Sequence, residues 1–210
     1  KLFLLFNIYY LLFIIVMLTL LNLIIQIPNF YLFSNRFKNV ELGTIYNSLV
    51  HSTLTSTLSI YYLLNPQDYI YQIISNYSKV YLIIDLVAIN YYPELKKYQK
   101  PYTLHHTIFL LSYYLANKDI YKYIICKLLL SEISVIFLDL RFILKFYNLG
   151  YLDELAYITY ILFFIFRITN MPVIMYNDYI SLLNINAHYI FVPMYSLQLY
   201  WFYNMSIKLI

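Results

Sequence analysis

Long apolar segments separated by short polar loops constrain this chain more than any other feature of its sequence. A helix needs about 20 apolar residues to cross a bilayer, and seven segments approach or exceed that length. These segments are Leu2–Ile27, Thr44–Leu64, Tyr71–Tyr92, Tyr102–Ala116, Ile120–Leu144, Asp153–Tyr176 and Ala187–Lys208. The sequence therefore predicts an all-α, polytopic membrane helix bundle with about seven transmembrane helices.

The connections between these segments contain residues that end or bend helices. Turn signals such as Asn65-Pro66 and Tyr92-Pro93 separate the spans. The fourth span is short, and only Asn117-Lys118-Asp119 separates it from the fifth. Pro172 and Pro193 fall inside spans six and seven, where proline is expected to kink a helix.

Composition excludes several classes of function. Charged residues make up only 11% of the chain, whereas soluble domains have about 25%. The net charge of +4 is spread thinly, which argues against a nucleic-acid partner. Cys126 is the single cysteine and no HExxH motif occurs, so we expect no disulfide, no metal site and no bound cofactor. The expected partners are the bilayer, a membrane lipid and, for an oligomer, another copy of the chain.

Basic residues orient the predicted bundle, because cytoplasmic loops are enriched in Lys and Arg. One side of the bundle receives Arg36, Lys38, Lys96, Lys97, Lys100, Lys145 and Lys208. The other side receives Lys1, Lys79, Lys118 and Lys122. This difference predicts a cytoplasmic C-terminus.

Polar side chains inside the predicted spans fall at similar depths. At about 1.5 Å per residue, most lie within about two to four helical turns of the predicted cytoplasmic face. These residues are His51, Asp85, His105, His106, Glu132, Asp139 and Asn204, while Arg167 lies nearer the middle of its span. Ionisable groups are costly in hydrocarbon and commonly mark a functional site.

The adjacent pair His105-His106 is the strongest of these signals. Neighbouring residues on a helix point about 100° apart, so one ring can face a cavity while the other contacts a neighbouring helix. An imidazole can act as a nucleophile or a general base. We predict His105, His106, Asp85, Glu132 and Asp139 as catalytic residues, and His51, Arg167, Tyr113, Trp201 and Asn204 as substrate-binding residues.

Each of these residues also has a structural interpretation. His51 could hydrogen-bond between helices, and Asp85 could pair with Arg167. Glu132 could pair with Lys127 or Arg167, while Tyr113 and Trp201 suit packing or the membrane interface. In the extreme case the whole polar layer would only hold the helices together.

An ordered set of short motifs resembles the TLC-domain family, which includes the ceramide synthases. The motifs are Asn35-Arg36, Ser48-Leu49-Val50-His51, Asp85, Leu104-His105-His106-Thr107-Ile108, Ser112-Tyr113 with Asn117, Leu130-Ser131-Glu132-Ile133-Ser134, Phe137-Leu138-Asp139-Leu140-Arg141, Phe163-Phe164-Ile165-Phe166-Arg167-Ile168 and Leu197-Gln198-Leu199-Tyr200-Trp201-Phe202-Tyr203. The resemblance covers residues 34–210 and leaves residues 1–33 as an N-terminal transmembrane anchor and loop.

The resemblance implies a six-helix, barrel-like core in the endoplasmic reticulum or a related membrane. It also implies acyl transfer from acyl-CoA to a sphingoid or other lipid acceptor, with His105 and His106 in the reacting role.

One position departs from the ceramide synthases, which have a second His-Asp pair where this chain has Ser131-Glu132. In this respect the chain is more similar to the less characterised TLC-domain proteins. Two hypotheses follow: a lipid acyltransferase, or a non-catalytic lipid sensor, lipid-homeostasis or trafficking factor that uses the same cavity.

Overall fold

The structure, a computed structural model, describes residues 39–115, 119–182 and 186–209, and all regular elements in these ranges are helical. They are α2 (Val40–Leu64), α3 (Asp68–Tyr91), η1 (Pro93–Tyr98), α4 (Gln99–Leu115), α5 (Asp119–Leu129), α6 (Glu132–Phe146), α7 (Leu152–Phe163), η2 (Phe164–Thr169), α8 (Asn170–Leu182) and α9 (Asn186–Leu209). The predicted all-α fold is thus confirmed for these residues. The predicted first span, Leu2–Ile27, and the anchor region 1–33 lie outside them.

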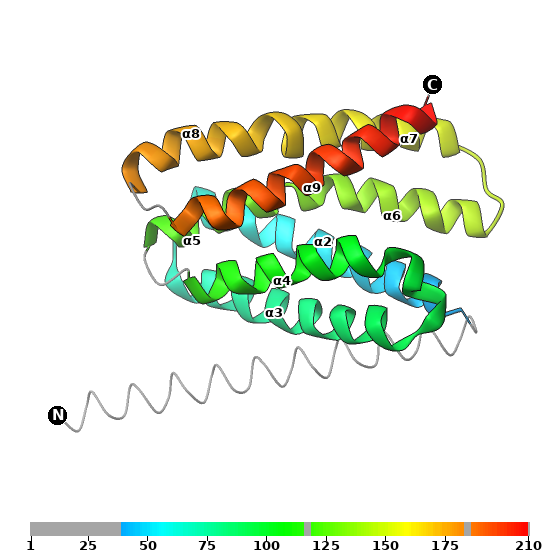
Figure 1. Cartoon of the computed structure of the whole chain (residues 1–210), viewed down its shortest axis with the longest axis horizontal. Helices are drawn as coiled ribbons and strands as arrows, with labels where there is room; N and C mark the ends of the chain where they lie inside the picture. The colour runs from blue at the N-terminus through cyan, green and yellow to red at the C-terminus, as the bar shows by residue number, and fades with distance from the viewer. Residues whose placement is uncertain (1–38, 116–118, 183–185, 210) are drawn as a thin grey trace.

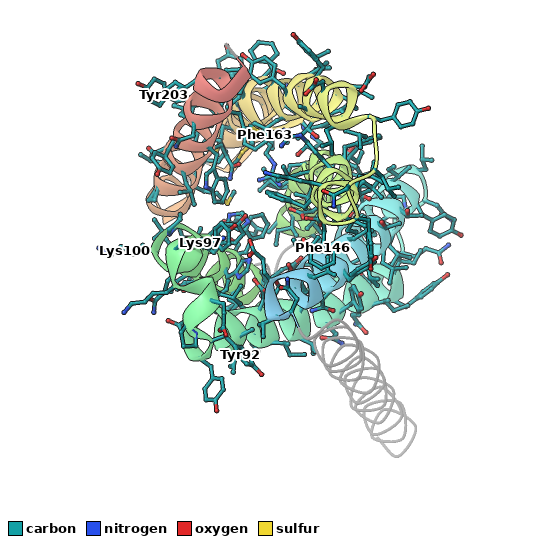
Figure 2. All side chains as sticks on the ribbon, turned by 90° about the vertical axis from the view of Figure 1, so that its right-hand side faces the viewer. Tyr92, Lys97, Lys100, Phe146, Phe163 and Tyr203 are labelled. Atoms are coloured by element: carbon teal, nitrogen blue, oxygen red, sulfur yellow. The ribbon has the colours of Figure 1, made fainter. Side chains whose placement is uncertain are left out.

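The long helices run side by side along one axis of the molecule (Figure 1). Contacts between neighbours close a ring: α2 packs on α3, α3 on α4, α4 on α9, α9 on α7, α7 on α6 and α6 on α2. Seen from the end at which η1 lies, the helices surround a space into which side chains project (Figure 2). Buried side chains from different helices can therefore meet inside the ring.

Two helices in the described part of the chain are long and apolar enough to cross a membrane, Asp68–Tyr91 and Leu152–Asn177. They correspond to predicted spans three and six. α4 has only 17 residues, fewer than the ~20 that a bilayer core requires. For the other predicted spans, crossing of the membrane stays a prediction.

The predicted fifth span, Ile120–Leu144, is wrong as a single helix. The chain turns at Leu130 and Ser131, which separates α5 from α6. The Ser131 carbonyl oxygen accepts hydrogen bonds from the hydroxyl of Ser134 (2.7 Å) and from Nε of Arg167 (3.3 Å). The backbone N–H of Ser134 also donates to this oxygen, at 3.2 Å. The turn thus leaves the Ser131 carbonyl accessible to Arg167, whose buried guanidinium needs acceptors.

The predicted sixth span continues beyond Tyr176 to Leu182 and includes the π-helical segment η2. Pro172 follows η2 and has no N–H to donate to the carbonyl of Ile168, four residues earlier. The hydroxyl of Tyr195 on α9 donates to that carbonyl instead, at 3.1 Å. This bond from a neighbouring helix accommodates the proline. Pro193 lies within α9, which continues as a helix around it.

Candidate functional site

A cavity of about 290 Å³ lies inside the ring of helices. All ten predicted site residues line it: His51, Asp85, His105, His106, Tyr113, Glu132, Asp139, Arg167, Trp201 and Asn204. The cavity reaches the end of the bundle shown in Figure 2, where part-exposed Glu41 and Tyr98 line it, and we call this end the mouth. The structure thus places the predicted residues together, while their chemical roles stay predictions.

His106 and Asp85 form a buried pair between α4 and α3. Nδ1 of His106 lies 3.3 Å from Oδ2 of Asp85, and both side chains are less than a tenth exposed. The two atoms are within ion-pair distance but are not aligned for a hydrogen bond. The alternative interpretation, in which Asp85 pairs with Arg167, does not hold, because α3 and α4 bring Asp85 to the imidazole of His106 instead.

His105 has an aromatic environment instead. Its ring meets Phe109 at 4.8 Å and Trp201 of α9 at 5.2 Å between centroids, in both cases edge to face. The rings of His105 and His106 are 5.5 Å apart. The doublet therefore presents two imidazoles to one cavity, of which His106 has the neighbouring carboxylate.

His51 stacks on Tyr81, with centroids 3.8 Å apart and rings only 9° from parallel. The ring of Tyr81 also meets His106 edge-on, at 6.0 Å. Nδ1 of His51 has no hydrogen-bond partner among the described residues. His51 thus packs against α3 as an aromatic ring instead of forming an interhelical hydrogen bond through Nδ1. Its role in substrate binding stays a prediction.

Arg167 anchors a second polar cluster, farther from the mouth. Its guanidinium donates to Oε1 of Gln198 at 2.8 Å, to the hydroxyl of Ser134 at 3.1 Å and to Oε1 of Glu132 at 3.3 Å. The predicted pairing of Glu132 with Arg167 is confirmed, whereas Nζ of Lys127 lies over the ring of Tyr123. A buried charge requires an opposite charge and hydrogen-bond partners. The carboxylate of Glu132 and the neutral acceptors supply both to Arg167.

Asp139 is buried on α6 and lines the cavity, with Oδ2 unpaired among the described residues. Asn204 lies nearer the mouth, and its amide donates to the carbonyl of Tyr200 at 2.8 Å. That bond is local to α9, and no hydrogen bond among the described residues joins Asn204 to the histidines.

Sequence reasoning missed eight polar residues of the cavity wall: Glu41, Thr44, Ser48, Ser78, Tyr81, Tyr98, Tyr102 and Ser134. Ser48 and Tyr102 precede His51 and His105 by three residues, a spacing that puts side chains on one helix face. That signal was present in the sequence. With 28 tyrosines in the chain, however, a single tyrosine carries little information.

Three side chains connect α2 to η1 at the mouth. Nζ of Lys97 lies 3.1 Å from Oε1 of Glu41, and the hydroxyl of Tyr98 donates to the same oxygen at 2.7 Å. Partial burial alone would raise the pKa of Glu41, but the hydrogen bonds from Tyr98 and Lys97 and the charge of Lys97 together lower it below its ordinary value. We call this group the mouth cluster.

The described residues contain no group of three His, Cys, Asp or Glu side chains arranged to hold a metal ion. The sequence model of the TLC domain matches residues 46–207, which include every cavity residue from Ser48 to Met205. No curated protein matches the chain, and no solved structure matches it.

Proposed function

This chain belongs to the TLC-domain family, and from that premise we propose that it is a membrane protein that acylates a lipid inside its cavity. The acyl donor would be acyl-CoA, and the acceptor an amine or hydroxyl of a sphingoid or another lipid. The observation that supports the proposal is the His106–Asp85 pair, which lines the cavity beside a second imidazole, His105.

The chemistry requires one proton acceptor and one charge partner. In this proposal, His106 removes the proton from the acceptor N–H or O–H as that nitrogen or oxygen bonds to the thioester carbonyl carbon. The carbon–sulfur bond then breaks, and the imidazolium returns the proton to the departing thiolate. Asp85 stabilises the transient positive charge, as a carboxylate does for a catalytic imidazole. His105 would position the acyl group or act as a nucleophile that transiently holds it.

A second candidate function is a non-catalytic lipid sensor, lipid-homeostasis or trafficking factor. Two observations favour it. Ser131-Glu132 supplies no further imidazole, and the Glu132 carboxylate is already paired with Arg167. Under this alternative the cavity binds a lipid, and the histidines provide hydrogen bonds without chemistry.

The proposed location is the endoplasmic reticulum membrane, with the mouth and the C-terminus facing the cytosol. Basic residues of η1 and of the adjoining start of α4, together with Lys145 near the end of α6, support this orientation. A C-terminal epitope tag should therefore be accessible to antibody when the plasma membrane alone is permeabilised. A tag accessible only after all membranes are permeabilised would reverse the orientation.

Lipidomics of cells that express the full chain tests the proposed activity. The test variant is His105→Ala/His106→Ala, and the matched control is Leu104→Ala/Leu111→Ala, which changes exposed positions of the same helix. We expect one class of N-acylated or O-acylated lipid to rise with the parent and control but not with the histidine variant. Equal lipid profiles at equal protein abundance would overturn acyl transfer and favour the non-catalytic function.

A further inference from the structure

Two buried hydroxyl groups at the inner end of the cavity are not used by the proposed chemistry. Ser78 on α3 is 1% exposed and Tyr113 on α4 is 4% exposed, and both line the cavity. Neither hydroxyl has a hydrogen-bond partner among the residues that the structure describes. The two hydroxyls lie near enough to interact electrostatically, but their geometry is not that of a hydrogen bond.

Each of these hydroxyls lies the same number of residues along its helix from one member of the His106–Asp85 pair. Tyr113 follows His106 by seven residues on α4, and Ser78 precedes Asp85 by seven residues on α3. The two helices pack on each other, and both steps lead away from the mouth. At about 1.5 Å per residue, the hydroxyl pair lies roughly 11 Å farther along the cavity than the His106–Asp85 pair.

The cavity wall between the two polar positions includes apolar side chains. Leu82 on α3 and Phe109 on α4 line this stretch. The Arg167–Glu132 ion pair is already formed, whereas the hydroxyls of Ser78 and Tyr113 have no hydrogen-bond partner among the described residues. An alkyl chain fits the apolar stretch, but its continuation would meet two unpaired hydroxyls.

We infer that Ser78 and Tyr113 form a second polar subsite, which recognises a hydroxyl group part-way along the lipid chain. The inference rests on the proposed lipid-binding function and specifies the class of lipid. A ligand hydroxyl can donate to one of these oxygens and accept from the other, whereas a plain methylene chain leaves both unpaired at a cost. An extended chain advances about 1.2 Å per bond, so the ligand hydroxyl lies about nine bonds beyond the carbonyl carbon.

Binding of three fatty acids to the purified full chain in lipid nanodiscs tests this subsite. The probes are hexadecanoic acid, 10-hydroxyhexadecanoic acid and, as positional control, 2-hydroxyhexadecanoic acid. We expect the 10-hydroxy acid to bind about five-fold more tightly than the other two, which is the effect of about one hydrogen bond. The Ser78→Ala/Tyr113→Phe variant should lose this preference and still bind hexadecanoic acid.

The matched control is Ser112→Ala/Tyr114→Phe, which removes the same two hydroxyl types from the residues that flank Tyr113. This variant should keep the preference for the 10-hydroxy acid. Equal binding of the three acids, or a preference that survives in Ser78→Ala/Tyr113→Phe, would overturn the subsite while lipid binding stands. If no acid binds to parent protein that retains its thermal unfolding transition, the subsite fails, whereas acyl transfer from acyl-CoA is decided by the lipidomic comparison.

Discussion

Oδ2 of Asp85 lies 3.3 Å from Nδ1 of His106, between two buried side chains on neighbouring helices. His105, the adjacent residue, meets Trp201 and Phe109 instead. The doublet thus divides into one imidazole beside an acid and one within an aromatic wall. This difference leads to distinct expectations for the residues around it.

Asp85→Asn should preserve the shape of the pair and remove its charge. Since the carboxylate stabilises the imidazolium in the proposed mechanism, we expect acyl-lipid formation to fall by about 100-fold or more. The measurement is product formation by purified protein from acyl-CoA and a lipid acceptor. Asp68→Asn, at an exposed carboxylate paired with Lys122, serves as the control and should remain active. Full activity of Asp85→Asn would exclude Asp85 from the reaction.

The Glu132–Arg167 pair should contribute strongly to stability. Glu132→Gln or Arg167→Met each leaves one buried charge without its partner, which costs about 3–5 kcal/mol. The double variant should be less destabilised than the sum of the two singles, because neither uncompensated charge remains. The measurement is the free energy of unfolding of the parent, the two single variants and the double variant, obtained by denaturant titration in detergent. The four values give the coupling energy between the two side chains. Strictly additive losses would show that the two side chains are not coupled.

His51 should tolerate replacement by another aromatic ring better than truncation. His51→Phe keeps the stack on Tyr81, whereas His51→Ala removes it and should lower stability by about 2 kcal/mol. His51→Phe also removes the unpaired ring nitrogen, so we expect less lipid to co-purify with it despite a near-normal unfolding temperature. If His51→Phe co-purifies with a normal amount of lipid, His51 only packs against Tyr81 and does not bind the lipid.

The mouth cluster should make stability depend on acid pH. The pKa of Glu41 is lowered in the folded protein, so its ionised form stabilises the fold above the ordinary pKa of about 4.3. This contribution is lost as the pH falls through the lowered value. We therefore expect Glu41→Gln to unfold at a lower temperature than the parent at pH 7.

The difference between Glu41→Gln and the parent should shrink as the pH falls below 4. Glu154→Gln, at an exposed position in the first turn of α7, controls for loss of a carboxylate. Thermal unfolding followed across this pH range provides the test. If the difference in unfolding temperature between Glu41→Gln and the parent stays constant with pH, ionisation of Glu41 does not stabilise the fold.

Several elements followed from local features of the sequence. α3 and α9 lie within a few residues of their predicted bounds because apolar runs and flanking turn signals are local properties. The break between α5 and α6 could not be predicted this way. It involves a hydrogen bond to Ser131 from Arg167, 36 residues later in the chain.

The sequence by itself determined that the chain forms apolar helices and that their polar residues lie at similar depths. Both properties depend on hydropathy and residue spacing along a single helix. The tertiary structure decided which of these residues meet. Asp85 lies beside His106 rather than Arg167, and Ser78 of α3 lies near Tyr113 of the neighbouring helix α4. Such pairings depend on how far each helix is rotated and shifted against its neighbours, and that is set by packing around the whole ring.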